Sequence, residues 1–332
     1  MSRALSRFAR RRAVQVSAVL AVVCGLLAWW LLPPGSPEPS GRVTFSTGVP
    51  SGVYQRYGKL LQGALARDLP DVSITLRDSE GSQQNLARLA AGEADFTIAT
   101  ADAVAQYQHA GLPGTNRLRG LARLYDDYVQ LVVPKSSKVT SVADLKGLRV
   151  GVGQEGSGVR LIADRVLSAG GLRPDRDVRP VSAGIDTMPG LLERGELDAF
   201  FWSGGLPTQA VQELSERHPV RLVPLAARLI AALHDEGGAA TRYYRSALIP
   251  ADAYARAQEG PVETLAVTNL LVTTDLTDPA MAEGLTRTVI RSRDRIGSQV
   301  HPAQLVDLRT AIYTDPLPLH EGAKNYYRSV KP

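Results

Sequence analysis

Short runs of alternating hydrophobic and polar residues recur along the chain from residue 42 onward, and amphipathic runs separate them. Alternation over a few residues indicates a strand, whereas apolar side chains at helical spacing indicate a helix. Strands are predicted over residues 42–47, 72–76, 96–99, 118–124, 128–133, 148–152, 178–181 and 199–202, and helices over 53–67, 157–169, 186–194 and 278–294, with further helices near 82 and 102 and one helical turn at 141–145. Strands that alternate with helices through short turns predict an α/β fold with parallel sheets.

The N-terminal segment has a different pattern. Residues 13–32 hold no charge and follow the three arginines of residues 10–12. A helix of this length, at about 1.5 Å per residue, spans roughly 30 Å, the thickness of the hydrocarbon layer of a membrane. The pattern predicts a cytoplasmic basic segment at residues 1–12, a signal-anchor or signal peptide at 13–32 and a linker at 33–41, with the body extracytoplasmic. The apolar run is longer than that of usual signal peptides and has no clean Ala-x-Ala site after it, which favours a single anchor in the cell membrane over a cleaved, secreted form.

Most of the excess positive charge lies in this segment. The chain has 38 Lys and Arg against 33 Asp and Glu, and five of the basic residues and one acid precede residue 41. The 33 basic and 32 acidic residues that remain leave the body almost neutral, which argues against a nucleic-acid-binding surface. The single cysteine, Cys24, excludes an intramolecular disulfide framework, and the histidines have no metal-binding spacing. We therefore expect no metal, no cofactor and no nucleic acid.

Three predicted strands lead into turns rich in glycine and serine, and each turn opens a helix. The turns contain Ser51-Gly52, Gly81-Ser82 and Gly156-Ser157-Gly158. A helix start presents unpaired N–H groups and about half a positive charge, so it can hold an anion. The serines can equally serve only as N-caps, each worth about 1 kcal/mol. Because ligands of α/β proteins bind beyond the carboxyl ends of strands, three such turns indicate a shared ligand site.

Other chemistry has little support in the sequence. Gly151, Gly153 and Gly156 match the GxGxxG dinucleotide fingerprint, but the next strand ends at residues 181–183 without the acidic residue that the fingerprint needs. The sequence has no phosphate loop with Gly-Lys-Ser/Thr, no Gly-x-Ser-x-Gly elbow and no distinct pair of catalytic carboxylates. We therefore expect a protein that is not an enzyme.

Several segments together resemble one protein family. They are STGVPSGVYQRYGKLL, DSEGSQQNLARLAAGEADFTIATADAVAQY, SVADLKGLRVGVGQEGSGVRLIADRVLSAGGL, LLERGELDAFFWSGGLPTQAVQEL and ALIPADAYARAQEGPVETLAVTNLLVTTD. In this order, over about residues 42–300, they are similar to the TAXI family, which comprises extracytoplasmic solute-binding subunits of TRAP transporters. The ordered set, with its GSG turn and DAFFWSGGLP, carries the resemblance.

The resemblance implies a type II periplasmic-binding-protein-like fold, in which hinge strands join two α/β lobes and the ligand lies between the lobes. Residues 128–134 and 265–273 are the best candidates for the hinge strands. Lobe one would comprise residues 42–130 and 270–332, and lobe two residues 134–265. The resemblance also implies that the lobes close over a small molecule.

The matched turns would supply the ligand-binding residues. By resemblance, lobe one would contribute Thr47, Ser51, Gly52, Tyr54, Ser82, Asn85 and Thr100, and lobe two Ser157, Gly158, Trp202, Gly204, Gly205 and Pro207. Members of the family are associated with small carboxylates such as glutamate, glutamine and related dicarboxylates. Helix starts and hydroxyls, with Arg56 or Arg160, could hold such a carboxylate. Val53 and Val159 stand where threonine is common in the family, so two hydroxyls that would orient a ligand are missing.

Three functions are left open by the sequence. The first is capture of a small carboxylate for delivery to a TRAP-type membrane permease, without covalent chemistry. The second is a ligand-sensing input protein for a membrane histidine kinase, because an uncleaved anchor would restrict diffusion. An exported enzyme on the same two-lobed scaffold is a third alternative.

Overall fold

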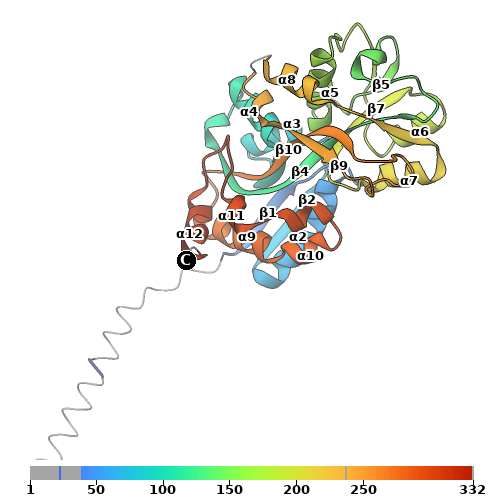
Figure 1. Ribbon diagram of the computed structural model, residues 1–332. Helices are drawn as coiled ribbons and strands as arrows, with labels where there is room; N and C mark the ends of the chain where they lie inside the picture. Colours follow the sequence, from blue (N-terminus) through green and yellow to red (C-terminus); the bar gives the residue numbers. More distant parts are fainter. Residues whose placement is uncertain (1–21, 24–38, 236–237, 331–332) are drawn as a thin grey trace, which may run out of the picture. The chain divides into compact units, whose positions relative to one another are not determined.

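In the computed structural model, ten strands pair into one sheet, with helices around it (Figure 1). The strands β8 (Val220–Val223) and β9 (Tyr244–Ile249) were not predicted from the sequence. The structure describes residues 22–23, 39–235 and 238–330. The strands are β1 (Gly41–Ser46), β2 (Val72–Arg77), β3 (Phe96–Thr100), β4 (Leu118–Pro134), β5 (Arg149–Gly151), β6 (Arg179–Val181), β7 (Ala199–Gly204), β8 (Val220–Val223), β9 (Tyr244–Ile249) and β10 (Val262–Thr274). The helices are α2 (Val53–Asp68), α3 (Ser82–Ala90), α4 (Ala101–His109), α5 (Gly158–Ala169), α6 (Met188–Glu193), α7 (Gln209–Arg217), α8 (Ala227–Asp235), α9 (Pro279–Arg291), α10 (Arg293–Gly297), α11 (Leu308–Ala311) and α12 (Glu321–Val330), with 3-10 turns η1 (Thr115–Arg117), η2 (Val142–Leu145), η3 (Thr241–Tyr243) and η4 (His301–Leu305).

The sheet combines parallel and antiparallel pairs. The strand order is β2-β1-β3-β10-β4-β7-β5-β6, with β8 beside β4 and β9 beside β10. β1 is parallel to β2 and β3, and β5 is parallel to β6 and β7. β10 runs antiparallel to β3 and β4, and β4 runs antiparallel to β7. The predicted parallel sheets are thus confirmed towards the two ends of the sheet, whereas its middle is antiparallel.

Two long strands, β4 and β10, run through the middle of the fold and connect separate parts of its hydrophobic core (Figure 1). One cluster of buried side chains comes from residues 129–267, and two others come from residues 43–125 and 270–327. The strands pass from one part to the other at the pair Asp127 and Val267. The core is therefore divided at the point where β4 and β10 pass from one group of clusters to the other.

We call the two parts on either side of this division lobe one and lobe two. Lobe one is residues 41–126 with 268–330, and lobe two is the described residues within 127–267. The predicted hinge segments, 128–134 and 265–273, lie within β4 and β10. The predicted domain boundaries remain a prediction, and they fall near the division of the core.

Most predicted elements are found within a few residues of their expected bounds. One prediction was wrong, because residues 118–124 and 128–133 belong to the single strand β4. The chain stays extended through the intervening residues, where Asp126 and Asp127 pair with Thr268 and Val267 of β10.

The predicted membrane segment, residues 13–32, lies outside the described residues apart from Val22 and Val23, so the anchor remains a prediction. Within the described ranges, every helix is too short or too polar to cross a bilayer.

Candidate functional site

A cavity lies between the two lobes, where strands of both lobes end and helices begin. The space between its wall atoms is about 620 Å³, a figure that includes open solvent. Lobe one contributes Gly48, Val49, Gly52, Val53, Tyr54, Glu80, Gly81, Ser82 and Thr100, and lobe two contributes Asp127, Gly153, Gln154, Ser157, Gly158, Val159, Gly184, Trp202, Ser203 and Gly204. A concave site at the carboxyl ends of strands is typical of small-molecule binding.

Three helix starts, from both lobes, reach this cavity. The N-caps of α2, α3 and α5 are Gly52, Gly81 and Ser157, and all three line the wall. In α5 the Oγ of Ser157 accepts the N–H of Arg160 at 3.0 Å, so Ser157 is the N-cap that the sequence predicted. The first N–H groups of a helix have no partner within it, so these three starts make the adjoining wall electropositive.

The N-cap interpretation was wrong for Ser51 and Ser82. Ser51 is exposed, and glycine precedes the first helical residue of both α2 and α3. Ser82 is the first residue of α3, and its Oγ accepts the N–H of Thr100 at 3.2 Å. The N-cap position of α3 has a φ of +131°, a conformation that glycine adopts readily and other residues rarely do, which explains why Gly81 occupies it. A Cβ at Gly81 would also lie 3.4 Å from the Cα of Ser157.

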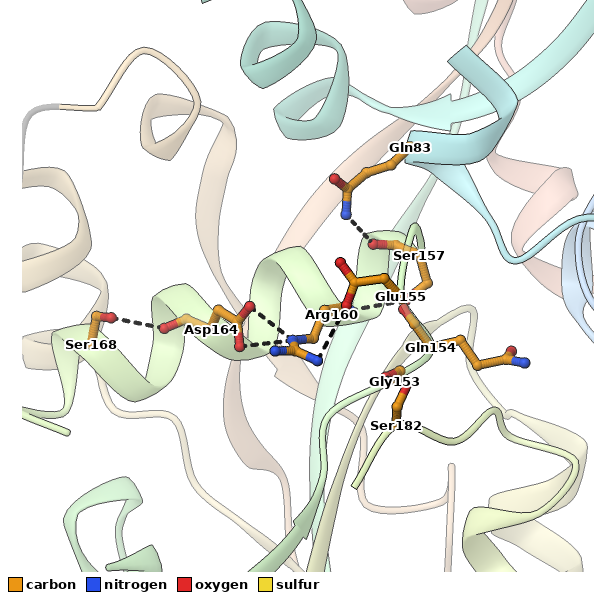
Figure 2. A network of polar contacts seen from close by, with 9 residues as sticks. All are labelled: Gln83, Gly153, Gln154, Glu155, Ser157, Arg160, Asp164, Ser168 and Ser182. Atoms are coloured by element: carbon orange, nitrogen blue, oxygen red, sulfur yellow. Dashed lines mark hydrogen bonds and ion pairs between the residues drawn. The ribbon is translucent and has the colours of Figure 1, made fainter. Parts of the chain in front are cut away.

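The lobes contact each other directly beside the cavity. The side chain of Gln83, on α3, donates from Nε2 to the carbonyl oxygen of Ser157 at 2.7 Å, as Figure 2 shows. The backbone N–H of Gln84 donates to the carbonyl oxygen of Gly156 at 3.0 Å. Because α3 belongs to lobe one and the start of α5 to lobe two, these bonds hold two helix starts together. The structure therefore shows the lobes closed on each other.

The two arginines considered for a carboxylate have other partners. Arg160 pairs through Nε with Asp164 at 2.9 Å, and its Nη1 lies 3.5 Å from Glu155 (Figure 2). Arg56 is exposed and donates to Oε1 of Gln209 at 3.2 Å. Neither lines the cavity, and no Lys, Arg or His occurs among the described residues of its wall. A carboxylate bound here would depend on N–H groups and hydroxyls.

Asp127 is the main site feature that the sequence analysis missed. Asp127 lines the cavity, only 4% of the residue is exposed, and Oδ1 has no hydrogen-bond partner among the described residues. Burial raises the pKa of Asp127 to about 7, the Asn269 side chain acts in the opposite direction, and the charges of Asp126 and Asp102 raise it further. Asp127 therefore titrates close to neutral pH.

Tyr54 links the surroundings of Asp127 to the start of α3. Its hydroxyl donates to Oδ1 of Asn269 at 2.5 Å and lies 3.2 Å from Oγ of Ser82. Burial raises the pKa of Tyr54 well above its ordinary value, and the charge of Asp127 acts in the same direction. The phenol is therefore neutral and keeps its proton for hydrogen bonding.

Eight of the thirteen predicted site residues lie in the cavity wall. They are Gly52, Tyr54, Ser82, Thr100, Ser157, Gly158, Trp202 and Gly204. Their convergence from separate segments is what the resemblance implied, and their role in ligand binding remains a prediction.

The other five predicted residues lie outside the wall. Thr47 and Asn85 are fully buried beneath it, where Nδ2 of Asn85 donates to the carbonyl oxygen of Thr47 at 2.7 Å. Gly205 packs against Pro302, since a Cβ at this glycine would lie 2.2 Å from the proline ring. Ser51 and Pro207 are exposed. Thr47 and Asn85 therefore support the turn that carries the site.

Several further wall residues were missed, and their signals were weak. Gly153 belongs to the GxGxxG run, which the sequence analysis weighed only as a dinucleotide fingerprint. Gly48, Gly184 and Gln154 lie in turns whose contacts depend on how the lobes meet. Ser203 follows Trp202 in the DAFFWSGGLP segment but was not among the predicted site residues.

Comparison with solved structures supports the assignment of the fold. A protein from Bordetella bronchiseptica RB50 matches with a TM-score of 0.53 and 19% identity, covering 86% of this chain and 81% of that one. A putative L-cystine ABC transporter from Listeria monocytogenes matches with a TM-score of 0.50 and 13% identity, covering 80% and 98%. An ancestral arginine-binding protein bound to arginine matches with a TM-score of 0.50 and 15% identity, covering 78% and 97%. The predicted periplasmic-binding-protein-like α/β fold is thus confirmed.

A family comparison covers the same part of the chain. The model of the NMT1-like family matches residues 45–330, a range that includes both lobes except residues 41–44, and every described residue of the cavity wall. The finer resemblance to TAXI subunits of TRAP transporters remains a prediction. With its two-lobed α/β fold and this match over most of its length, the chain belongs to the NMT1-like family.

Proposed function

We propose that this protein is an extracytoplasmic solute-binding protein that captures a small carboxylate and delivers it to a TRAP-type membrane permease. The observation that carries the proposal is the cavity in which helix starts and hydroxyls from both lobes converge. The NMT1-like family match, and a fold shared with an arginine-binding protein and a putative L-cystine ABC transporter, support solute binding. The ordered TAXI-like segments favour a TRAP-type permease as the partner.

Two helix starts would hold the carboxylate. The starts of α3 and α5 face each other across the lobe boundary, since a Cβ at Gly158 would lie 3.1 Å from Oγ of Ser82. Each start carries about half a positive charge, so the two repel each other when the lobes close. An anion in the cavity beside both starts offsets this repulsion and can accept N–H groups that have no partner within their own helix. A carboxylate therefore favours the closed arrangement.

Closure would transmit the bound state to a membrane partner. A ligand that contacts both lobes stabilises the closed form by the difference between its affinities for the closed and open forms. Binding and release then need no covalent chemistry in this chain. The ion gradient of the permease would supply the energy for transport, and the segment at residues 13–32 would tether the protein to the membrane.

Calorimetry and thermal-shift measurements on the full-length chain test this proposal. We expect at least one member of a panel of small carboxylates, including glutamate, glutamine and 2-oxoglutarate, to bind with a stoichiometry of one and to raise the melting temperature. If nothing binds across the panel or a wider metabolite library, the proposal is rejected. If a ligand binds but cells that lack the protein take it up at the normal rate, delivery to a permease is rejected and the histidine-kinase input remains.

A further inference from the structure

Both charged side chains in the cavity wall are acidic. They are Glu80 of lobe one and Asp127 of lobe two, and the described wall contains no basic side chain to balance them. Oδ1 of Asp127 and Oε2 of Glu80 are buried without a hydrogen-bond partner, and so is Oγ of Ser203. An ionised carboxylate can only accept hydrogen bonds. Where these carboxylates are ionised, whatever fills the cavity must therefore offer them hydrogen-bond donors.

The neighbouring residue shows how the protein treats an aspartate that it pairs internally. Asp126 accepts the Oγ1–H of Thr268 at 2.8 Å, and its carboxylate lies 2.5 Å from Nη2 of Arg245 and 3.4 Å from Nη2 of Arg123. Asp127 follows it on β4 and makes no ion pair within the described ranges. One aspartate thus has two arginines, whereas the next is buried at the cavity with no cation. A buried charge without a partner is costly, so Asp127 either holds a proton or pairs with a positive charge that the ligand brings.

We infer that Asp127 binds a protonated nitrogen of the ligand, so that the site accepts small carboxylates that carry an ammonium group and rejects those of equal size that lack it. This inference rests on the proposed function and narrows its ligand class. The ligand carboxylate would lie at the starts of α3 and α5, and its ammonium against Asp127. Tyr54, which contacts Ser82 and Asn269, links these two ends of the site.

Charge balance favours such a ligand over a dicarboxylate. A second carboxylate near Asp127 would add another negative charge to a buried site. The described residues of the cavity wall include no basic side chain to offset it. The other titratable groups around Asp127 are Asp102, Asp126, Tyr54 and Tyr125, and none of them supplies a positive charge. Because burial raises the pKa of Asp127 to about 7, an adjacent ammonium would lower it again and keep the carboxylate ionised.

Matched pairs of amino and oxo acids test the inference on the full-length chain at pH 8. The pairs are alanine with pyruvate, valine with 3-methyl-2-oxobutanoate and glutamate with 2-oxoglutarate, and each pair differs only in the nitrogen-bearing centre. We expect the amino acid of the best-binding pair to bind at least roughly 100-fold more tightly than its oxo acid, because the oxo acid leaves the buried carboxylate unpaired. In Asp127→Asn the ratio should fall below about tenfold, whereas Asp126→Asn, which alters a carboxylate outside the wall, should retain it.

The outcomes separate this inference from the proposed function. If an oxo acid or another carboxylate without nitrogen binds as tightly as its amino counterpart, the inference is overturned and solute binding stands. If Asp127→Asn keeps the full discrimination, or Asp126→Asn loses it equally, Asp127 is not the selecting residue and the inference is overturned. If no member of any pair and no other carboxylate binds, both proposals are rejected.

Discussion

The Nη1 atom of Arg165, on α5 of lobe two, lies 3.4 Å from Oδ2 of Asp102, on α4 of lobe one. The same carboxylate oxygen accepts the hydroxyl hydrogen of Tyr244 at 2.7 Å, and Nη2 of Arg165 donates to Oε1 of Gln106 at 2.8 Å. The Asp102 side chain is fully buried. When one partner of a buried ion pair is removed, the other is left as an uncompensated charge. This pair therefore ties the lobes together at a second place besides the bond between Gln83 and Ser157.

Replacement of Arg165 by leucine should destabilise the protein and loosen the closed arrangement. We expect Arg165→Leu to lower the free energy of unfolding by about 3 kcal/mol in urea denaturation, because Asp102 loses its cation. X-ray scattering of the ligand-free variant should show a larger radius of gyration than the wild type. The matched control is Arg194→Leu, which breaks an exposed ion pair with Glu196 within lobe two and should change both quantities little. Equal effects of the two variants would contradict the assigned role of Arg165.

The sequence contained most of the information on local structure. Alternation and helical spacing depend on neighbouring residues, so β1 and α2 were predicted almost to their ends. The union of two predicted strands into β4 was missed because Asp126 and Asp127 interrupt the apolar pattern. Their extended conformation is set by pairing with β10, a strand more than a hundred residues away in the chain, and no local pattern encodes that pairing.

The candidate site was only partly predictable, for the same reason. Ser157 was recognised because an N-cap serine acts within one turn of its own helix. Ser82, on α3, instead accepts a hydrogen bond from the N–H of Thr100 on β3, and Thr47 supports a turn from beneath the wall. Asp127 could not be identified as a site residue from the sequence. Its role depends on burial between the lobes and on the lack of a cationic partner among the described residues, and neither is visible in a local pattern.

The capping role of Ser157 can be measured directly. We expect Ser157→Ala to lower the free energy of unfolding by about 1 kcal/mol, because the N–H of Arg160 loses its acceptor. Ser51→Ala should leave stability almost unchanged, since Ser51 is exposed and is not the N-cap of α2. Urea denaturation of the two variants checks both values. A larger loss for Ser51→Ala than for Ser157→Ala would contradict the assignment of the caps.

A methyl group at Gly158 should interfere with closure rather than with folding. In Gly158→Ala the new Cβ would lie 3.1 Å from Oγ of Ser82 and 3.5 Å from Oγ1 of Thr100, both in the opposite lobe. We expect ligand affinity to fall about tenfold and the melting temperature of the ligand-free protein to stay near the wild-type value. Gly63→Ala, on α2 with open space around it, should retain full affinity and gain helix stability of roughly 0.5–1 kcal/mol. Calorimetry on both variants would contradict this reasoning if Gly63→Ala weakened binding as much as Gly158→Ala.

The pH dependence of stability should reveal the cost of burying Asp127. In the folded protein its pKa is raised to about 7, whereas an aspartate in an unfolded chain has a pKa near 4. Between these values the folded form holds a proton that the unfolded form has released. The contribution of Asp127 to the free energy of unfolding should therefore fall as the pH rises from about 4 to about 7, and the loss should then level off.

Asp127→Asn removes this titrating group, so the ligand-free variant should become more stable than the wild type as the pH rises through this window. A difference of three pKa units corresponds to about 4 kcal/mol at most, and we expect about 2–4 kcal/mol in urea denaturation at pH 8.

Asp126→Asn should have the opposite effect and lower the free energy of unfolding at pH 8. Although burial alone would raise the pKa of Asp126, hydrogen bonds from Arg245 and Thr268 and the charges of Arg245 and Arg123 hold it below its ordinary value. Asp126 therefore stabilises the fold above about pH 4, and its contribution is lost as the pH falls through the folded-state pKa. If Asp127→Asn is less stable than the wild type at pH 8, Asp127 has a stabilising partner in the ligand-free protein, and a binding site that keeps this carboxylate for a ligand is excluded.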